Sequence, residues 1–357
     1  MKRLNHLSEN TFLKLFFTFF SLCFLVAAFF MPDRDQMIPG FIRILCSPTK
    51  ASANFFSIGG YAATFLNMGL VGLICTSLYC IPGVKSNPAA TLVNILTTSF
   101  GSWGIHILNM WPTVFGVMVY CLIKKRPLGN YTNAMLFSTG LAPFISELML
   151  RYPDASTVGF TPMGARMKDH FTLMNDPDHV KDVIQTYGNA TFLLNAGFSG
   201  LYVLFYYNVI GAEFNGITFG IIFGMLSTCN AGSHPGNVWP IMIGYALASH
   251  LSQILSHLAG GTFSQPLHAQ AMMVGLCFAN GLTPISDKYG WRYGLFAAVL
   301  HYYMVTTVPN LHGGFCLYNG GFTANLVCIL LLPILEHHFK TKQQRLDMRN
   351  SDAVLFE

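Results

Sequence analysis

Long apolar runs dominate the pattern of hydrophobic and polar positions along this chain. A transmembrane helix needs about 20 predominantly apolar residues, whereas the strands of an outer-membrane barrel would alternate apolar and polar side chains. These runs do not alternate, so the pattern predicts an all-α polytopic helical membrane protein. The expected membrane segments are 12–30, 55–80, 105–123, 134–150, 192–210, 238–258, 269–285, 293–308 and 325–335.

Two further apolar segments, 88–101 and 215–228, have only about 14 residues each, which is too short to cross a bilayer. We expect them to form broken or re-entrant half-helices. In the second of them, Gly216, Gly220 and Gly224 share one helix face, which allows close contact with a neighbouring helix.

An internal duplication is visible in the polar and small residues of the apolar runs. The pattern G-x-H-x-x-N-x-W-P occurs around His106 and again around His234, at a constant offset of 128 positions. Asn67, with glycines two and five positions later, reappears at the same offset as Asn195 with the same glycines. Chance similarity would give scattered Leu and Phe matches, so we predict two homologous repeats.

The longest polar stretch separates the two copies, and it sets the domain boundaries that we predict. The chain divides into an N-terminal transmembrane helix with its connector (1–56), membrane repeat 1 (57–152), a polar connecting loop (153–189), membrane repeat 2 (190–293), two C-terminal membrane helices (294–336) and a polar basic tail (337–357).

The distribution of basic residues favours inverted repeats. Lys124-Lys125-Arg126 and the C-terminal tail should both face the cytoplasm. They do so if segments 88–101 and 215–228 do not cross, which leaves three full spans per repeat and turns the copies upside down relative to each other. The scheme places Lys2, Arg3 and Lys14 outside, against the rule. No small-x-small cleavage site follows segment 12–30, which favours a retained helix over a signal peptide.

Composition supports the membrane assignment. Only 10% of the 357 residues are charged and 52% are hydrophobic, whereas a soluble domain carries about 25% charged residues. The net charge of +5 lies in loops, so it indicates membrane orientation and no nucleic-acid partner. We expect the chain in the lipid bilayer of the bacterial inner membrane, either as a monomer or as a homo-oligomer.

Motifs for metal, cofactor or hydrolytic chemistry are missing from the sequence. The nine cysteines stand without a CxxC pair, so we expect reduced packing residues, no metal site and no cofactor. The Asp-Pro-Asp-His stretch 176–179 favours a solvated turn, because no second ligand cluster has matching spacing. There is no G-x-S-x-G, H-E-x-x-H or Walker sequence, so ATP does not drive the protein directly.

His106 and His234 are the best candidates for chemistry. Each follows a short apolar segment, and matched interruptions in two halves mark the sites of transporters. An imidazole there can donate, accept or relay a proton, and Asn109 and Asn237 would share a helix face with it. The alternative is structural: each histidine caps a broken helix by bonding orphan backbone carbonyls.

Two more matched pairs carry open alternatives. Asn67 and Asn195 lie in apolar helices, where an unbonded amide is costly, so each either contacts a solute or makes a helix–helix hydrogen bond. Glu147 and Asp287 follow the two Gly-Leu-x-Pro elements. Each is either a gating or proton-coupling carboxylate or the ion-pair partner of the arginine that follows it.

Other conspicuous side chains receive a structural interpretation. Trp111 and Trp239 favour packing or interfacial anchoring over solute contact. Four histidines lack a counterpart in the other repeat and are treated as incidental: His250, His257, His268 and His301.

The chain resembles an uncharacterised family of bacterial multi-pass membrane proteins with an internal G-x-H-x-x-N repeat. The resemblance covers roughly Ser57 to Glu336 and rests on Asn-Ala-Gly-Phe-Ser-Gly at 195–200, Gly-x-His-Pro-x-Asn around His234, His-Gly-Gly at 312–314 and Leu-Tyr-Asn at 317–319. It implies the duplicated architecture and adds no substrate. The family often has Lys before the motif histidine, where this chain has Ile105 and Ser233. In plan only, the paired histidines are similar to ammonium channels, and Leu-Tyr-Asn-Gly is similar to urea channels.

These observations favour a channel or secondary transporter for a small polar solute. An intramembrane enzyme using the paired histidines is one alternative, but catalytic sites seldom need two copies of every group; a structural membrane subunit is another. We expect the six His and Asn residues of the matched pairs to line one site near the midplane. Since a buried cation is costly, both histidines should be neutral, which suits a neutral solute or a proton-coupled anion.

Overall fold

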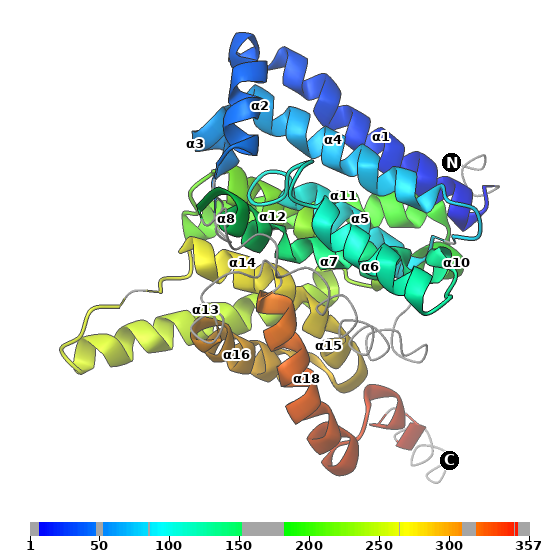
Figure 1. The fold of residues 1–357 in the computed structure, drawn as a ribbon. Coiled ribbons are helices and arrows are strands. Elements are labelled where there is room, and N and C mark those ends of the chain that lie inside the picture. Colours follow the sequence, from blue (N-terminus) through cyan, green and yellow to red (C-terminus); the bar gives the residue numbers. More distant parts are fainter. Residues whose placement is uncertain are drawn as a thin grey trace. The chain divides into compact units, whose positions relative to one another are not determined.

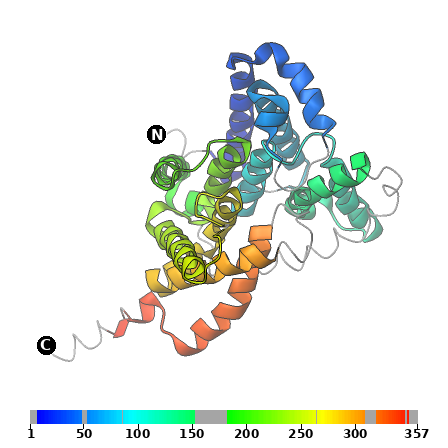
Figure 2. The same cartoon turned by 90° about the vertical axis from the view of Figure 1, so that its left-hand side faces the viewer.

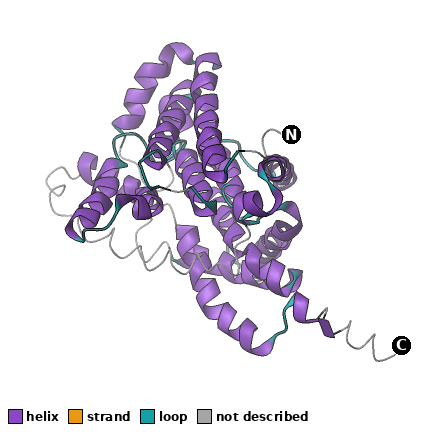
Figure 3. Cartoon of the chain, turned by 90° about the vertical axis from the view of Figure 1, so that its right-hand side faces the viewer, coloured by secondary structure: helices purple, strands orange, loops and turns teal. Residues whose placement is uncertain are grey.

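The computed structural model describes residues 7–47, 53–84, 86–151, 182–263, 265–308, 319–345 and 347–348. This part of the chain consists of helices and loops without strands (Figure 3), which confirms the all-α fold. The α-helices are α1 (Glu9–Phe30), α2 (Met37–Leu45), α3 (Phe55–Gly59), α4 (Tyr61–Tyr79), α5 (Pro88–Phe100), α6 (Trp111–Ile123), α7 (Thr132–Ser138), α8 (Ala142–Arg151), α10 (Val183–Tyr187), α11 (Asn189–Ile210), α12 (Gly216–Leu226), α13 (Pro235–Leu258), α14 (Gln270–Ala279), α15 (Thr283–Tyr289), α16 (Trp291–Thr307) and α18 (Asn319–His338).

Five of the described helices are long and apolar enough to cross a membrane: α1, α4, α11, α13 and α18. Their outward faces carry large apolar side chains, among them Phe19, Phe30 and Phe198, which are 68%, 76% and 64% exposed. Water would disfavour such a surface, whereas lipid tails match it. The helices therefore suggest a multi-pass membrane protein.

The chain forms two compact units, each with its own internal contacts. Among the described residues, unit 1 comprises those within 7–204 and 213–232, and unit 2 comprises those within 205–212, 233–308 and 319–348. Unit 1 therefore contains all of repeat 1 together with the first part of repeat 2. The domain boundaries expected from the sequence stay a prediction.

In unit 1, the N-terminal helix α1 lies antiparallel to α4, as both views of the ribbon show (Figures 1 and 2). Leu25 packs at Gly69, and Ser21 packs at Gly72 one turn further along α4. Both glycines belong to the duplicated Asn-x-Gly-x-x-Gly element. Their missing side chains let the two helices approach closely, as small residues do in membrane helix pairs.

A short helix, one glycine and a longer helix form a joint that occurs three times in the described residues. The glycines are Gly60 between α3 and α4, Gly188 between α10 and α11, and Gly290 between α15 and α16, with φ of 92°, 87° and 113°. Residues with side chains rarely adopt such angles. At the first joint, the Asp33 carboxylate accepts the first two backbone N–H groups of α4 (2.7 and 3.1 Å), which have no partner inside the helix.

A phenylalanine cluster ties α1 to both repeats within unit 1. Phe16 lies 5.2 Å from Phe192 of α11, and Phe24 lies 5.2 Å from Phe223 of α12, both edge to face. Phe24 also lies 6.1 Å from Phe65 of α4. Such ring pairs stabilise beyond the area that they bury. The abundance of phenylalanine in α1 thus reflects packing against elements distant in sequence.

The two segments expected to be short are the 13-residue helix α5 and the 11-residue helix α12. Each begins at an asparagine N-cap, Asn87 or Asn215, whose Oδ1 accepts a backbone N–H of the first turn. These caps are 128 positions apart. The duplication therefore preserves the start of the half-helix as well as the motif after it.

The two half-helices pack against each other antiparallel within unit 1. Nδ2 of Asn230, just after α12, donates to Oγ1 of Thr91 near the start of α5 (3.3 Å). At the other end, Gly220 of α12 packs against Ser99 and Ser102 at the end of α5. The two contacts are equivalent under the repeat. Moving Asn230 back by 128 positions gives Ser102, and moving Thr91 forward by 128 gives the residue next to Gly220.

The expectation that segment 105–123 spans the membrane is wrong, because α6 is a helix of only 13 residues. Residues 101–110 form turns, and the helix begins at Trp111 with Pro112 in its first turn, where proline is tolerated. Segments 134–150 and 269–285 also break, each at its Gly-Leu-x-Pro element. A 3-10 turn joins α7 to α8, and another joins α14 to α15.

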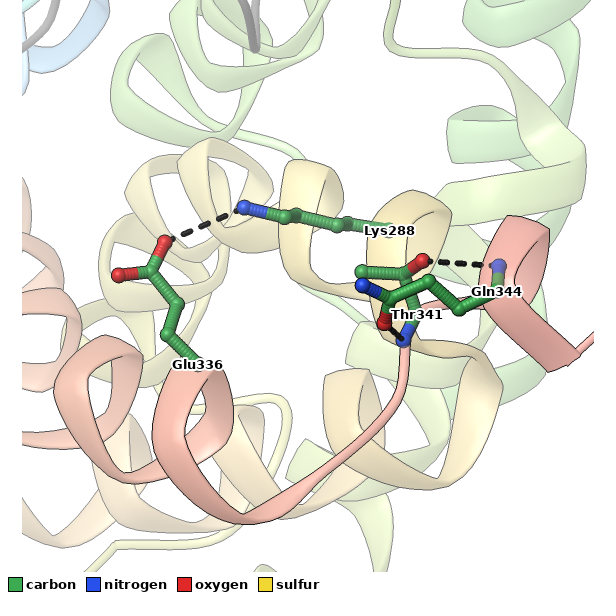
Figure 4. A network of polar contacts seen from close by, with 4 residues as sticks. All are labelled: Lys288, Glu336, Thr341 and Gln344. Carbon is green, nitrogen blue, oxygen red and sulfur yellow. Dashed lines mark hydrogen bonds and ion pairs between the residues drawn. The ribbon is translucent and has the colours of Figure 1, made fainter.

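In unit 2, α13, α14 and α18 pack around α16. A polar network fastens the segment that follows α18 (Figure 4). Lys288 pairs with Glu336 at 3.2 Å, while Thr341 and Gln344 cap each other's backbone N–H groups at 2.9 and 3.2 Å. Arg345 donates to the carbonyl that ends α15 (2.6 Å). The segment after α18 is thereby held at the joint between α15 and α16.

Candidate functional site

The first motif forms a buried turn in unit 1 between α5 and α6. The backbone N–H of His106 donates to Oδ1 of Asn109 (2.9 Å), and Nδ2 of Asn109 donates to the carbonyl of Gly104 (2.9 Å). The backbone N–H of Leu108 donates to Nδ1 of His106 (3.3 Å). Because Nδ1 accepts this bond, the neutral ring carries its proton on Nε2.

Ser146 of α8 completes this turn. Its Oγ lies 3.1 Å from Nε2 of His106 and 2.9 Å from Nδ2 of Asn109. Both nitrogens are donors, so the hydroxyl accepts twice. His106 and Asn109 are each only 2% exposed, and in such surroundings an unmade hydrogen bond would be costly. The three side chains therefore form one rigid, neutral network.

The second motif repeats the same backbone bonds in unit 2. The N–H of His234 donates to Oδ1 of Asn237 (2.9 Å), and the N–H of Gly236 donates to Nδ1 of His234 (3.1 Å). His234 is thereby the N-cap of α13. His234 therefore caps a helix, as the structural alternative expected. It does so by accepting the N–H of Gly236, whereas the expected cap donated to backbone carbonyls. The cap occupies Nδ1, and Nε2 makes no hydrogen bond within the described part of the chain.

The structural counterpart of Asp287 is Ser146, which corrects the pairing of Asp287 with Glu147 by one position. Oδ2 of Asp287 accepts from Nδ2 of Asn237 (2.8 Å), as Ser146 accepts from Asn109. The offset grows from 128 to 141 because the 24-residue α13 and its following loop are longer than the 13-residue α6 and its loop. Glu147 is buried beside Ser146. A gating role for either carboxylate stays a prediction.

Asn67 and Asn195 hold the backbone just before each motif. Nδ2 of Asn67 donates to the carbonyls of Gly101 (2.7 Å) and Ile105 (2.8 Å). Nδ2 of Asn195 donates to the carbonyl of Cys229 (3.2 Å), which lies 128 positions after Gly101. Both amides thus bond backbone carbonyls at the end of the half-helix and in the turn after it, and solute contact by either stays a prediction. Oδ1 of Asn67 is buried and makes no hydrogen bond within the described residues.

The two motifs differ in burial and in charge. His106 is buried, and its hydrogen bonds within the described residues join it to neutral groups, whereas His234 and Asp287 are exposed. A serine hydroxyl can only share hydrogen bonds, but an imidazole and a carboxylate on one scaffold can also take up and release protons. Since His106 belongs to unit 1 and His234 to unit 2, their gathering into one site stays a prediction.

His301 of α16 is the residue that sequence reasoning missed. It is wholly buried, and its Nδ1 lies 2.5 Å from the hydroxyl of Tyr245 on α13. Its Nε2 lies 2.8 Å from the carbonyl of Gly320 and 2.9 Å from Oγ1 of Thr323, both on α18. The ring therefore ties three helices of unit 2 together. Its only sequence signal was a polar residue inside an apolar run.

The tryptophans of the motifs pack against other aromatic rings. Trp111 stacks on Phe115 at 5.4 Å, and Trp239 lies 5.8 Å from Trp291. The 176–179 stretch and the His-Gly-Gly and Leu-Tyr elements at 312–318 lie outside the described residues. Within the described ranges, no three His, Cys, Asp or Glu side chains gather in a way that could hold a metal ion.

The family comparison agrees with the duplication. The model of a family described as proteins of unknown function, DUF1576, matches the chain twice, over residues 33–166 and 162–337. No curated protein and no solved structure matches the chain. Two successive matches to one model confirm the internal repeat, and together they cover most of the sequence. The chain therefore belongs to the DUF1576 family of proteins of unknown function.

Proposed function

We propose that the chain is a channel or secondary transporter for a small polar solute, and that the two Asn–His turns line its path. The observation that carries the proposal is a duplicated, hydrogen-bonded turn that fixes an imidazole after the short half-helix of each repeat. In both copies a backbone N–H occupies Nδ1; Nε2 of His106 donates to the hydroxyl of Ser146, and Nε2 of His234 makes no hydrogen bond within the described residues. Paired interruptions in the two halves of a membrane protein are typical of transport sites.

The difference between the turns suggests how transport is coupled. Repeat 1 offers His106, Asn109 and a serine hydroxyl, which are neutral and suit a solute that shares hydrogen bonds. Repeat 2 offers His234 and, through Asn237, the carboxylate of Asp287. We assign proton uptake to repeat 2, which fits a neutral solute or an anion that moves together with a proton.

We further infer that the repeats are inverted. The antiparallel packing of α5 against α12, with reciprocal contacts at both ends, supports this arrangement. Pro82 and Ile210 occupy equivalent positions, 128 residues apart: Pro82 follows α4 and precedes α5, and Ile210 is the last residue of α11, before α12. In a cysteine-free background, Pro82→Cys and Ile210→Cys should react with a membrane-impermeant maleimide from opposite sides. Labelling of both from one side would refute inversion.

Flux into proteoliposomes tests the proposed function. The panel should hold urea, glycerol, methylammonium, acetate and formate, each with and without an imposed pH gradient. His106→Ala and His234→Ala should each lower the flux of the accepted solute about tenfold, the effect of losing one good hydrogen bond to the solute. Asp287→Asn should remove the dependence on the pH gradient and retain downhill flux.

His257→Ala is the matched control, because His257 lies on α13 with its side chain exposed, far along the helix from His234. It should transport like the wild type. If folded His106→Ala and His234→Ala also transport normally, the turns are structural caps and the proposal fails. Absence of flux for every solute, from protein that is folded and inserted, would also overturn it.

A further inference from the structure

A seam of buried oxygen atoms runs between α1, α4 and α5 in unit 1. Ser21, Thr76, Asn94 and Thr98 form it, and each of these residues is at most 4% exposed. A methyl group added at Gly72 would lie 3.0 Å from Oγ1 of Thr98 and closer still to Oγ of Ser21. One turn further, Nδ2 of Asn94 approaches Oγ1 of Thr76 at 3.5 Å. The seam meets the middle of α1 and the C-terminal half of α4, two helices long enough to span a membrane.

Repeat 2 provides an internal control for this seam, because it builds the same helix contact without oxygen atoms. Gly200, the counterpart of Gly72, packs against Leu226, and Leu226 is the counterpart of Thr98. The positions that correspond to Thr76 and Asn94 are likewise leucine and isoleucine. Aliphatic side chains therefore satisfy the packing of this element. The buried polarity of repeat 1 exceeds what packing requires, and burying it is costly.

The seam offers lone pairs and few protons. The hydroxyl groups of Ser21, Thr76 and Thr98 donate to the carbonyls of Phe17, Gly72 and Asn94 of their own helices, each at 2.8 Å. Each hydroxyl proton is used in one of these bonds, so the hydroxyl oxygens can only accept further hydrogen bonds or coordinate a cation. Oδ1 of Asn94 is fully buried and makes no hydrogen bond within the described residues. A ligand of the seam must therefore carry positive charge or donate hydrogen bonds.

We propose that this seam binds a small monovalent cation, either an alkali ion such as sodium or ammonium. Neutral hydroxyl and amide oxygens can replace the hydration shell of such an ion, as carbonyl oxygens do in cation channels. The four side chains that form the seam include no carboxylate, which disfavours a divalent ion, whose sites use Asp and Glu oxygens. An anion would face acceptor atoms, apart from Nδ2 of Asn94. Binding at the seam does not depend on whether the Asn–His turns transport a solute.

Thermal unfolding of the full chain in lipid nanodiscs tests the proposal. Sodium, lithium, potassium or ammonium chloride should replace choline chloride at constant ionic strength. The bound ion should raise the Tm saturably, by about 4 °C or more once its concentration exceeds the Kd a hundredfold. If only an alkali ion raises the Tm, the seam binds an alkali ion; if only ammonium raises it, the seam binds ammonium.

Thr98→Leu with Asn94→Ile copies repeat 2 into the seam and should abolish the shift while the protein stays folded. Thr64→Val is the matched control, since this buried α4 hydroxyl also donates to a carbonyl of its own helix but lies outside the seam. It should keep the shift. Should the double variant unfold, equilibrium binding of radioactive sodium, with displacement by ammonium, decides on the wild type. Three results would overturn the proposal. They are an equal Tm in all salts including choline chloride, a Tm shift that survives in the double variant, and the absence of bound sodium and ammonium.

Discussion

Replacing Asn67 by leucine removes the clamp that shapes the first Asn–His turn. The amide donates to two carbonyls, those of Gly101 and Ile105, on either side of the turn that leads into His106. Leucine has the same branching and the same number of side-chain heavy atoms, so the substitution leaves no large cavity. The perturbation therefore isolates the loss of two donors to buried backbone oxygens.

The cost follows from the burial of those oxygens. A hydrogen bond between membrane helices contributes only about 0.6 kcal/mol on average, but a buried acceptor left without its donor costs about 1–3 kcal/mol. Gly101 and Ile105 are both buried. The second effect therefore dominates, and Asn67→Leu should lower the free energy of unfolding by about 2–4 kcal/mol.

Unfolding in mixed micelles by titration with sodium dodecyl sulfate, followed by tryptophan fluorescence, measures this difference. Thr64→Val on the same helix is the comparison, because the Gly60 carbonyl that loses the hydroxyl keeps a backbone N–H at 3.2 Å. That variant should lose no more than about 0.5 kcal/mol. If Asn67→Leu also loses less than this, the clamp does not stabilise the turn and the reasoning is refuted.

Three further stability predictions use the same assay. Gly72→Ala should lower the free energy of unfolding by about 1–3 kcal/mol, because its methyl group meets α1 and α5. At Gly200 the nearest atom is 3.7 Å away, so Gly200→Ala should leave the free energy of unfolding unchanged or raise it by up to about 1 kcal/mol. Equal effects of the two substitutions would contradict the difference in packing. His301→Ala should cost about 3 kcal/mol. A double-mutant cycle with Tyr245→Phe should give a coupling of about 1–2 kcal/mol, and additive effects would argue against the hydrogen bond. Lys288→Ala should cost less than about 1 kcal/mol because its ion pair is partly exposed; a loss above about 2 kcal/mol would contradict this.

The repeat and its broken helices were readable from the sequence because glycine, proline and asparagine act locally. Asn87 and Asn215 cap the half-helices wherever those helices pack, and Gly60 and Gly188 fix a backbone angle that other residues rarely adopt. A constant offset between such residues therefore carries structural information. Helix length was less certain, and α6 proved short because turns occupy its first predicted residues.

The partners of the site residues were not readable, because partnership depends on which elements meet in space. Ser146 is one of many serines, and only its contact with His106 singles it out. The change of offset after the motif concealed that it corresponds to Asp287. The search for matched residues also passed over His301 and Asn94, because neither has a polar counterpart in the other repeat.

The composition of unit 1 has a consequence for biogenesis. Its polar helix α5 leaves the ribosome early, but α12, which covers one side of it, follows roughly 130 residues later. At synthesis rates of about 5–20 residues per second, α5 waits on the order of ten seconds for that partner. During this interval α1, α4 and α7, which also pack against α5, can shield its hydroxyl and amide groups from lipid. The first copy of the repeat and the N-terminal helix thereby protect a polar helix until the second copy arrives.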